Sequence, residues 1–459
     1  MTTSKHASLR RKTSSFRATA IALSLACLAT GTAFSAGNDE NPFSPANGHA
    51  YRHGVTPTRE AWEHMKEWAT QNASPAGPRA SKTLSYGGGV DGIGVTSGTP
   101  KIYLVFYGSQ WGTQGVDGSG NSTFSGDTNG AAPYLQQLFK GIGTGGELWS
   151  GVMTQYCDGA VATNATSCPA SGVTHVGYPT GGPFAGVWYD NSAASPSQAT
   201  AAQLAQEAIA AAAHFGNTTA ASNRYAQYVI LSPSGTHPDG FSASGQFCAW
   251  HDWNGDIGVS SPYGDIAFTN MPYVLDLGAS CGQNFVNAGS AGTLDGFSIV
   301  NGHEYSETIT DQNPAGGWTN HSSGQENADE CAWISTGQGA SANVVMANGT
   351  FAMQSTWSND TNECDISHAI ITGGGGGGGG PTASFSFVAS HLVVNFTDGS
   401  TDSGATITAH AWTFGDGGTS TLANPSHTYK KPGSYSVTEK VTDSNNASSS
   451  ATKSVSVKH

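Results

Sequence analysis

The sequence predicts a mixed α+β domain followed by a small all-β sandwich. The first prediction rests on the order strand, helix, strand between about residues 101 and 234, which is typical of a core that combines a sheet with helices. The second rests on short strand-like runs at regular spacing after residue 381, with turn residues between them. The eight glycines of 373–380 have no side chains to pack, so they predict a flexible linker between the two parts.

Two apolar runs predict the buried strands of the first domain. KIYLVFYG (101–108) is short, rich in β-branched and aromatic residues, and stops at a glycine. RYAQYVILSPS (224–234) has the same character. A helix between them would complete the strand–helix–strand order.

Two segments predict helices. In 195–216, Ser195 would be the N-terminal cap and Gln198 would complete a capping box. In LDGFSIVNGHEYSETIT (294–310), the apolar residues lie on one side of a helix and predict one buried face. That face would hold Leu294, Phe297, Ile299 and Val300.

The N-terminus predicts export. Residues 1–36 contain a basic stretch, a short apolar run and then small residues, which is the pattern of a signal peptide. We therefore expect a secreted, soluble, monomeric protein without a membrane anchor. The predicted organisation is 1–36 signal peptide, 37–82 N-terminal arm or propeptide, 83–372 first domain, 373–380 glycine linker, and 381–459 sandwich.

The charge lies in one part of the chain. Removing the five basic residues of the signal peptide takes the net charge from −14 to −19. From residue 381 onward acidic and basic residues are equal in number, so the first domain carries the whole acidic excess. Such a domain repels nucleic acid and anionic lipid, and we expect neither as a partner.

Six cysteines remain after the signal peptide, an even number that predicts three disulfides in an exported protein. Six cysteines allow 15 pairings. Pairing of sequence neighbours is the simplest of them. Thiolate metal ligation is the alternative, but no CxxC spacing occurs. The predicted pairs are Cys157–Cys168, Cys248–Cys281 and Cys331–Cys364.

The C-terminal part resembles the PKD (polycystic kidney disease repeat) family. The resemblance lies in WTFGDG, in NPSHTY and in GSYSVTEKVTD, which occur in that order between residues 412 and 443. It implies an immunoglobulin-like sandwich that often accompanies secreted hydrolases and contacts protein or polymeric substrate. No catalytic residue is expected in it.

The segment HEYSE carries the chemistry. On a helix, His303 and Glu307 are four residues apart and share one face, with Glu304 beside them. This is the arrangement of HExxH zinc peptidases with glutamate in place of the second histidine, and it predicts a zincin-like metal helix. In those enzymes the intervening glutamate is the general base. Glu326 and Asp329, three residues apart, are candidates to complete the site. Carboxylate ligands suit zinc but also other divalent ions, Ca²⁺ among them.

The first domain resembles the plant EXORDIUM (phosphate-induced) family and its bacterial relatives. IYLVFYG, RYAQYVILS and FCAWHDW match in order, and the resemblance is strongest over residues 300–331. It implies that His303, Glu304, Glu307, Glu326 and Asp329 form one constellation. Its matching positions are Val300, Gly302, His303, Glu304, Glu307, Thr310, Asp311, Trp318, Glu326, Asp329 and Cys331.

His251 lies in the matching FCAWHDW element, either as a further ligand or transition-state donor or as a structural histidine. These patterns predict a secreted zinc endopeptidase-like hydrolase with Glu304 as the catalytic base and a PKD module that docks on substrate. The alternative is a non-catalytic extracellular binding or signalling protein, in which the same carboxylates hold a structural ion or join loops. In that reading Glu304 and Glu307 could also be ordinary helix charges.

Overall fold

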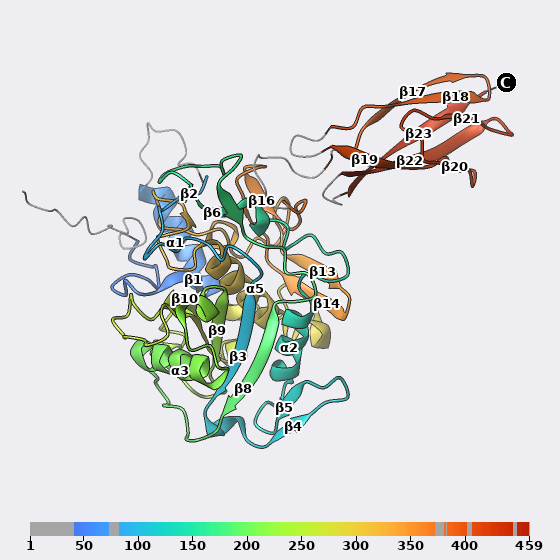
Figure 1. Cartoon of the computed structure of the whole chain (residues 1–459). Coiled ribbons are helices and arrows are strands. Elements are labelled where there is room, and N and C mark those ends of the chain that lie inside the picture. Colours follow the sequence, from blue (N-terminus) through green and yellow to red (C-terminus); the bar gives the residue numbers. More distant parts are fainter. Residues whose placement is uncertain are drawn as a thin grey trace, which may run out of the picture. The chain divides into compact units, whose positions relative to one another are not determined.

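The structure is a computed structural model that describes residues 41–72, 82–371, 381, 383–401, 406–443 and 448–458. The predicted signal peptide and the glycine linker lie outside these residues. Within the described residues, helices and sheets form the first part of the chain and a β-sandwich forms the second (Figure 1). None of the described helices is both long and apolar enough to cross a membrane.

A six-stranded sheet forms the centre of the first domain. Its strands, in spatial order, are β1 (His53–Pro57), β10 (Phe247–Trp253), β11 (Ala267–Met271), β9 (Ala226–Leu231), β3 (Lys101–Tyr107) and β8 (Phe184–Asp190). The last four of these are parallel to one another, whereas β10 and β1 are each antiparallel to their neighbours. The runs predicted as buried strands, 101–108 and 224–234, are thus β3 and β9.

Two helices pack on opposite faces of this sheet. The side chain of Gln227 on β9 donates a hydrogen bond to Thr308 of one helix, while the next residue, Tyr228, bonds Asn217 just beyond the end of another. Neighbouring residues of a strand point to opposite faces. The domain's helices are α1 (Arg59–Asn72), α2 (Ala131–Gly141), α3 (Ala201–His214), α4 (Ala220–Asn223) and α5 (Asp295–Thr310).

Helix α3 begins later than the sequence predicts. Thr200, not Ser195, is its cap, and Gln203 completes the capping box. Both residues are followed three positions later by glutamine, so the local pattern fits either start. The tertiary structure decides, because the main chain of Ser195 is held by the side-chain amide of Gln110 beyond the end of β3.

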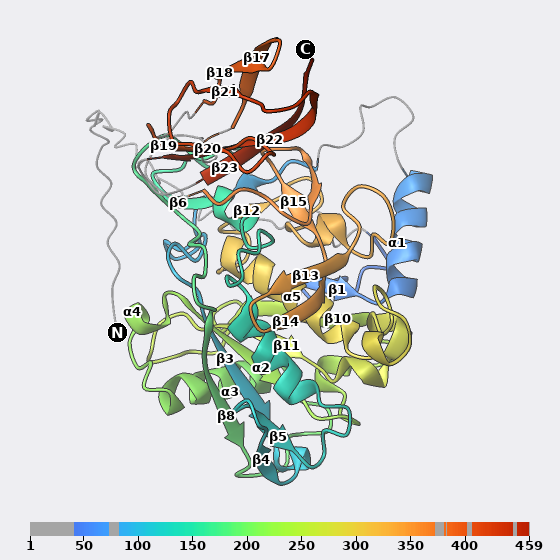
Figure 2. The ribbon, with the colours of Figure 1, turned by 90° about the vertical axis from the view of Figure 1, so that its right-hand side faces the viewer.

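Helix α5 departs from the prediction of one buried face. Every residue from Asp295 to Thr310 is buried, because the helix packs against β1 and β10 on one side and against β14 on another (Figure 2). A helix that is enclosed in this way can carry polar groups only if they have partners or a ligand. The strongly polar segment HEYSE therefore lies inside the domain.

Small two-stranded sheets and three disulfides also belong to the first domain. The disulfides join Cys157 to Cys168, Cys248 to Cys281 and Cys331 to Cys364, which confirms the predicted pairing. The paired short strands are β2 (Ser85–Tyr86) with β12 (Trp318–Thr319), β4 (Gln114–Val116) with β5 (Ser122–Phe124), β6 (Cys157–Gly159) with β7 (Val173–His175), β13 (Ala342–Met346) with β14 (Gly349–Met353), and β15 (Thr356–Ser358) with β16 (Glu363–Asp365).

The predicted N-terminal arm does not lie free of the domain. Its strand β1 is an edge strand of the central sheet, and the buried Arg52 just before it forms an ion pair with the partly buried Asp239. The segment from Asn41 to Asn72 is thus packed on the first domain, which excludes a free arm for these residues.

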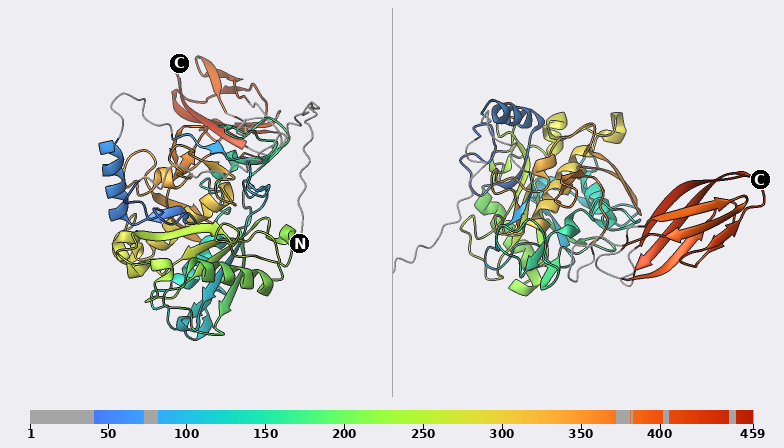
Figure 3. Two further views of the ribbon diagram at one scale, coloured as in Figure 1. Left: turned by 90° about the vertical axis from the view of Figure 1, so that its left-hand side faces the viewer. Right: turned by 90° about the horizontal axis from the view of Figure 1, so that it is seen from above.

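The C-terminal part is the predicted sandwich of two antiparallel sheets (Figure 3). Aromatic side chains from both sheets, Trp412 of the WTFGDG motif among them, fill a core of its own. One sheet contains β17 (Phe385–Ser390), β18 (Val393–Asp398) and β21 (Ser426–Thr428). The other contains β20 (Thr419–Ser420), β19 (Ile407–Thr413), β22 (Gly433–Asp443) and β23 (Ser448–Val457).

Candidate metal centre

Helix α5 brings the first three candidate residues together. His303 and Glu307 lie one turn apart, with Nε2 of the histidine 3.1 Å from Oε2 of the glutamate. This spacing follows from the helical repeat, which places residues i and i+4 on the same face. Glu304 lies on the neighbouring face of the same turn, where its Oε1 accepts a hydrogen bond of 2.6 Å from the hydroxyl of Thr56.

The downstream acidic residues return to this helix. Oδ1 of Asp329 lies 3.5 Å from Nε2 of His303, and the main-chain N–H of Asp329 donates to Oε1 of Glu307 at 2.8 Å. Asp329 begins a short 3₁₀ helix, η8 (Asp329–Cys331), whose last residue forms the disulfide to Cys364. The main chain of Glu326 donates to Asp329 Oδ2, which fixes the loop in front of it.

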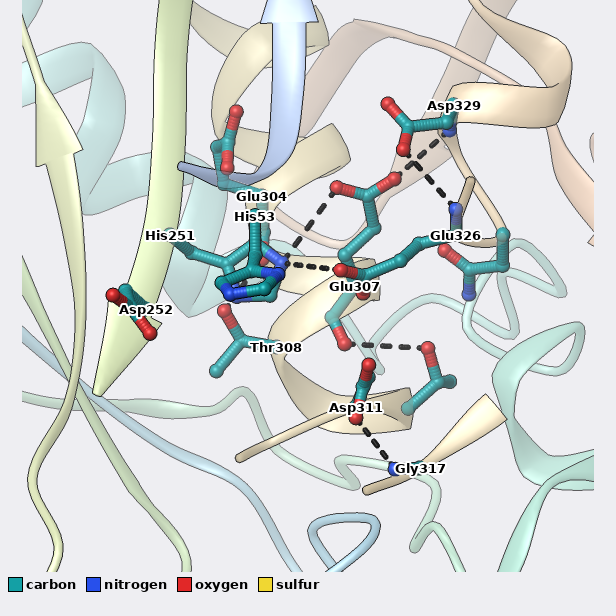
Figure 4. Close-up of polar contacts among 12 residues, drawn as sticks. His53, His251, Asp252, Glu304, Glu307, Thr308, Asp311, Gly317, Glu326 and Asp329 are labelled. Carbon is teal, nitrogen blue, oxygen red and sulfur yellow. Dashed lines mark hydrogen bonds and ion pairs between the residues drawn. The ribbon is translucent and has the colours of Figure 1, made fainter. Parts of the chain in front are cut away.

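His251 approaches from the central sheet. Its Nε2 lies 3.4 Å from Oε1 of Glu326 and 3.8 Å from Oε2 of Glu307. Strand β10 holds this histidine, and the disulfide between Cys248 and Cys281 anchors the same strand three residues earlier. Figure 4 shows the side chains converging from β10, from α5 and from the loop that follows α5.

These side chains form two overlapping groups with metal-ligating atoms within 4.8 Å of one another. One contains His303, Glu307 and Asp329, and the other contains His251, Glu307 and Glu326. Glu307 belongs to both groups. The structure thus brings together all four of the predicted ligands and the additional histidine, from segments as far apart as residues 251 and 329.

The site passes a test of fit for a cation. His251, His303, Glu304, Glu307, Glu326 and Asp329 are all buried, with at most 5 % of each residue exposed. Several of their polar atoms nevertheless have no hydrogen-bond partner among the described residues. Buried polar atoms of this kind are rare without a ligand or water. Imidazole nitrogen together with carboxylate oxygen is a donor set that suits zinc. The atoms without a hydrogen bond are Nδ1 and Nε2 of His251, Nε2 of His303, Oε2 of Glu304, Oε2 of Glu307 and Oε2 of Glu326. Of these, Nε2 of His303 and Oε2 of Glu307 lie at ion-pair distance from each other.

The electrostatics of the cluster also favour a cation. Burial is the main cause that raises the pKa of Glu326 well above its ordinary value, and repulsion from Asp311 and Glu307 adds to it. Burial likewise raises the pKa of Glu307, with repulsion from Asp329 next. For His303, burial lowers the pKa, but attraction to Glu307 and Asp329 outweighs it and the net shift is upward. A divalent ion among these carboxylates would offset their mutual repulsion.

Gln354 orients the histidine of the helix, and the sequence contains no signal for it. Nδ1 of His303 lies 3.2 Å from Oε1 of Gln354, and the amide nitrogen of that glutamine donates to the carbonyl oxygen of Ala328 at 2.6 Å. The amide oxygen therefore faces His303, so Nδ1 donates to it and Nε2 points toward the carboxylates of the cluster. Such a partner is common for metal-ligating histidines.

The N-terminal segment covers the site, a second feature with no sequence signal. Gly54 of β1 lies so close that a side-chain β-carbon there would collide with Nε2 of His251 and Oε2 of Glu307. It also has φ of +48°, a conformation that favours glycine. With Thr56 bonded to Glu304, this one strand touches both the candidate ligands and the candidate base.

Comparison with known protein families identifies the C-terminal part. A family model described as PKD domain matches residues 381–458, which confirms the prediction for this part of the chain. The crystal structure of the PKD1 domain from the Vibrio cholerae metalloprotease PrtV is 39 % identical and covers 17 % of this chain and 98 % of that one, with a TM-score of 0.17. The PKD1 domain of Vibrio anguillarum Epp is 32 % identical and covers 17 % of this chain and 93 % of that one, with a TM-score of 0.17.

Three curated relatives match the same PKD region. The pre-pro-metalloprotease PrtV of Vibrio cholerae is 46 % identical over 63 residues, 14 % of this chain and 7 % of the relative. The collagenase ColQ1 of Bacillus cereus is 44 % identical over 61 residues, 13 % of this chain and 6 % of the relative. A microbial collagenase of Vibrio alginolyticus is 45 % identical over 58 residues, which are 13 % of this chain and 7 % of the relative. The chain thus spans only a small fraction of the relatives it matches.

Proposed function

We propose that the first domain is a metal-dependent hydrolase, a zinc endopeptidase, and that the PKD domain brings it to a protein or polymeric substrate outside the cell. The observation that carries the proposal is the convergence of two histidines and three carboxylates, since His251, His303, Glu307 and Glu326 each have a buried side-chain atom without a hydrogen-bond partner among the described residues. A purely structural cluster would satisfy these atoms with hydrogen bonds from its own chain.

The residues divide into two roles. The ion would be held by the two ligand groups, which contain His303, Glu307, Asp329, His251 and Glu326. When bound, a zinc ion polarises a substrate carbonyl and makes water more acidic. Glu304 belongs to neither ligand group, and its Oε2 is free. It is therefore suited to take a proton from the attacking water and to return it to the departing amine.

Three further observations support the proposal. The HExxE arrangement lies on a helix, as it does in peptidases that use HExxH. Five of the positions on which the resemblance of residues 300–331 to the EXORDIUM family rests lie in or beside this cluster, namely His303, Glu304, Glu307, Glu326 and Asp329. The relatives that share the PKD region are a metalloprotease and two collagenases, which supports an extracellular place and a proteinaceous substrate for this chain.

Metal analysis tests the proposal directly. We expect the purified protein to contain about one zinc ion per chain, and His303→Ala and Glu307→Gln to lose it. His214→Ala is the matched control, because that histidine lies on α3 and stacks on Trp188 away from the cluster. Retained zinc in both site variants would contradict the ligand assignment.

The complete burial of the cluster favours one other function, a non-catalytic extracellular binding protein with a structural ion. That protein would bind Ca²⁺ through six or more oxygen atoms at 2.3–2.6 Å, whereas the enzyme would hold zinc at 2.0–2.2 Å. X-ray absorption at the metal edge separates the two. Calcium, together with no hydrolysis of casein or gelatin, would favour the binding protein.

A further inference from the structure

The catalytic proposal raises a question of access. A peptidase that acts on proteins must admit an extended chain, but His251, His303 and Glu307 are each fully buried. The element that covers them is β1, which belongs to the N-terminal segment and not to the body of the domain. Access to the site therefore depends on what β1 does.

We propose that the segment Asn41–Asn72 is an internal inhibitor, and that its strand β1 occupies the place of an extended peptide substrate along β10. This inference rests on the proposed function. It assigns a substrate-binding edge on β10 and a preference for arginine in the bound peptide.

The main chain of β1 lies as a bound peptide would. It pairs antiparallel with β10, with His53 opposite His251 and Pro57 opposite Phe247. Addition of a strand to a sheet edge is a general way to bind an extended peptide, because the main-chain hydrogen bonds do not depend on the peptide's sequence. The register places His53, the first residue of β1, opposite the candidate ligand His251.

Gly54 is the point of closest approach. Its main chain fills the space beside Nε2 of His251 and Oε2 of Glu307, so a larger residue has no room there. Two residues later, Thr56 donates its hydroxyl hydrogen to Oε1 of Glu304. One strand thus blocks the ligand cluster and holds the candidate base in a hydrogen bond, which is what an inhibitor of this site must do.

Arg52 fills a specific subsite two residues before Gly54. Its Nε donates to Oδ2 of Asp239 at 2.7 Å, its Nη2 donates to the carbonyl oxygen of Asp239 at 2.7 Å, and its guanidinium lies 4.8 Å from the ring centre of Phe247. Asp239 itself has φ of +50°, an unusual conformation for aspartate. A planar cation held by a carboxylate and an aromatic ring is a selective arrangement for arginine. The same contacts would select substrates that carry arginine at this position.

The first experiment compares two glycines of the segment. Gly54→Ala places a methyl group against His251 and Glu307, whereas Gly48→Ala meets nothing within 4 Å; both residues have positive φ, so both variants bear the same kind of backbone strain. We expect a chromogenic chelator to remove zinc from Gly54→Ala at least about tenfold faster than from the wild type, because a colliding methyl displaces β1 from the packed site. The Gly48→Ala variant should match the wild type within about twofold. Equal release rates for all three proteins would overturn the proposal.

The second experiment separates the segment from the domain after folding. A specific protease sequence is inserted directly after Asn72 in the full chain, and the folded protein is cleaved and separated from the released segment. We expect the remaining chain to stay folded by near-ultraviolet circular dichroism, to bind a fluorescent peptide with the sequence of residues 48–58, and to hydrolyse casein at least about tenfold faster than the uncut chain. The same peptide with Arg52→Ala should bind about tenfold or more weakly, because the carboxylate of Asp239, whose side chain is only 10 % exposed, then lacks its charged partner.

The outcomes distinguish this inference from the proposed function. Loss of the native fold upon release, or no binding of the 48–58 peptide, would show that β1 is an integral strand and would overturn the inference. Tight and arginine-dependent peptide binding without any hydrolysis of casein would overturn the peptidase function and leave the assignment of the peptide-binding edge standing. Peptide binding does not require hydrolysis, so the two results are independent.

Discussion

Nδ1 of His303 lies 3.2 Å from Oε1 of Gln354, a residue that comes 51 positions later in the chain. The contact joins the candidate metal helix to the loop that follows β14. It sets the orientation of the imidazole ring, and through the ring it sets the direction in which Nε2 faces the carboxylates. The first prediction depends on it.

Gln354→Ala should weaken zinc binding by about 10–100-fold, which is the usual effect of removing the partner of a metal-ligating histidine. Competition with a chromogenic chelator measures the affinity. Gln338→Ala is the control, because this exposed glutamine also donates its amide to a main-chain carbonyl, that of Cys364. An unchanged zinc affinity in Gln354→Ala would show that the contact does not orient a ligand.

Glu304→Gln should reduce hydrolysis of casein by about 10²–10⁴-fold and leave the zinc content unchanged, because the residue acts on protons and belongs to neither ligand group. The measurement is made on protein from which the segment Asn41–Asn72 has been released. Thr56 keeps the side chain in place in the uncut chain, since glutamine can still accept its hydrogen bond. Loss of zinc in this variant would mean that Glu304 is a ligand.

The stability of the first domain should fall as the pH rises from about 5 to about 8, because of Glu207 on α3. Burial is the largest cause that raises the pKa of this carboxyl from 4.5 to about 8, and the neighbouring Asp190 adds to it. Between these two values the folded state binds a proton that the unfolded state has lost, so the free energy of unfolding decreases with pH. Glu207→Gln mimics the protonated acid and should add about 2–4 kcal/mol of stability at pH 8, and little at pH 4.

Urea unfolding at the two pH values measures this effect. The control is Glu363→Gln, because Glu363 is exposed on β16 and its charge is solvated in both states. The assignment to Glu207 would be wrong if Glu207→Gln lost stability between pH 5 and pH 8 as steeply as the wild type.

Replacing both Cys248 and Cys281 by alanine should destabilise the first domain by about 3–4 kcal/mol, the value expected for a link across 33 residues. Because this disulfide anchors β10 three residues before His251, zinc affinity should fall as well. The pair Cys157 and Cys168 is the control, since it closes a loop of only 11 residues that carries none of the candidate ligands. If the two double variants bound zinc with equal affinity, the disulfide of β10 would have no role in placing His251 for metal binding.

A chain that ends at Thr372 should hydrolyse small soluble peptides as fast as the full chain and insoluble protein more slowly. The PKD domain has its own hydrophobic core, and no candidate metal ligand of the first domain comes from it. Initial rates on a fluorogenic peptide and on insoluble collagen compare the two chains. A slower reaction on the small peptide would show that the PKD domain contributes to the catalytic domain itself.

Local patterns predicted much of this structure, and the exceptions have physical reasons. Strands β3 and β9 and helix α5 follow from apolar runs, and the pair His303 and Glu307 follows from the helical repeat. Glu326 and Asp329 were candidates because of their spacing downstream of the helix, and the family resemblance added to this. The role of His251 stayed open, because nothing local indicates which distant segments meet.

Two features had no local signal at all. Strand β1 contains Gly54 and ends at Pro57, residues that weaken a strand pattern, and its partner β10 lies almost 200 residues later. Nothing in the sequence around Gln354 distinguishes it from other glutamines, and only the fold brings it to His303.

The sequence predicts too early a start for helix α3, because Ser195 and Thr200 have the same capping pattern. Only the contact of Ser195 with Gln110 distinguishes the two residues.

The two disulfides next to the candidate centre tie its assembly to redox conditions. One anchors the strand that holds His251, and the other anchors the turn that holds Asp329. In a reducing cytoplasm both disulfides are reduced, and His251 and Asp329 are then held only by non-covalent contacts. The proposed hydrolase would therefore gain a complete centre only after export. The proteins of the producing cell would be spared for that reason, in addition to the proposed inhibition by β1.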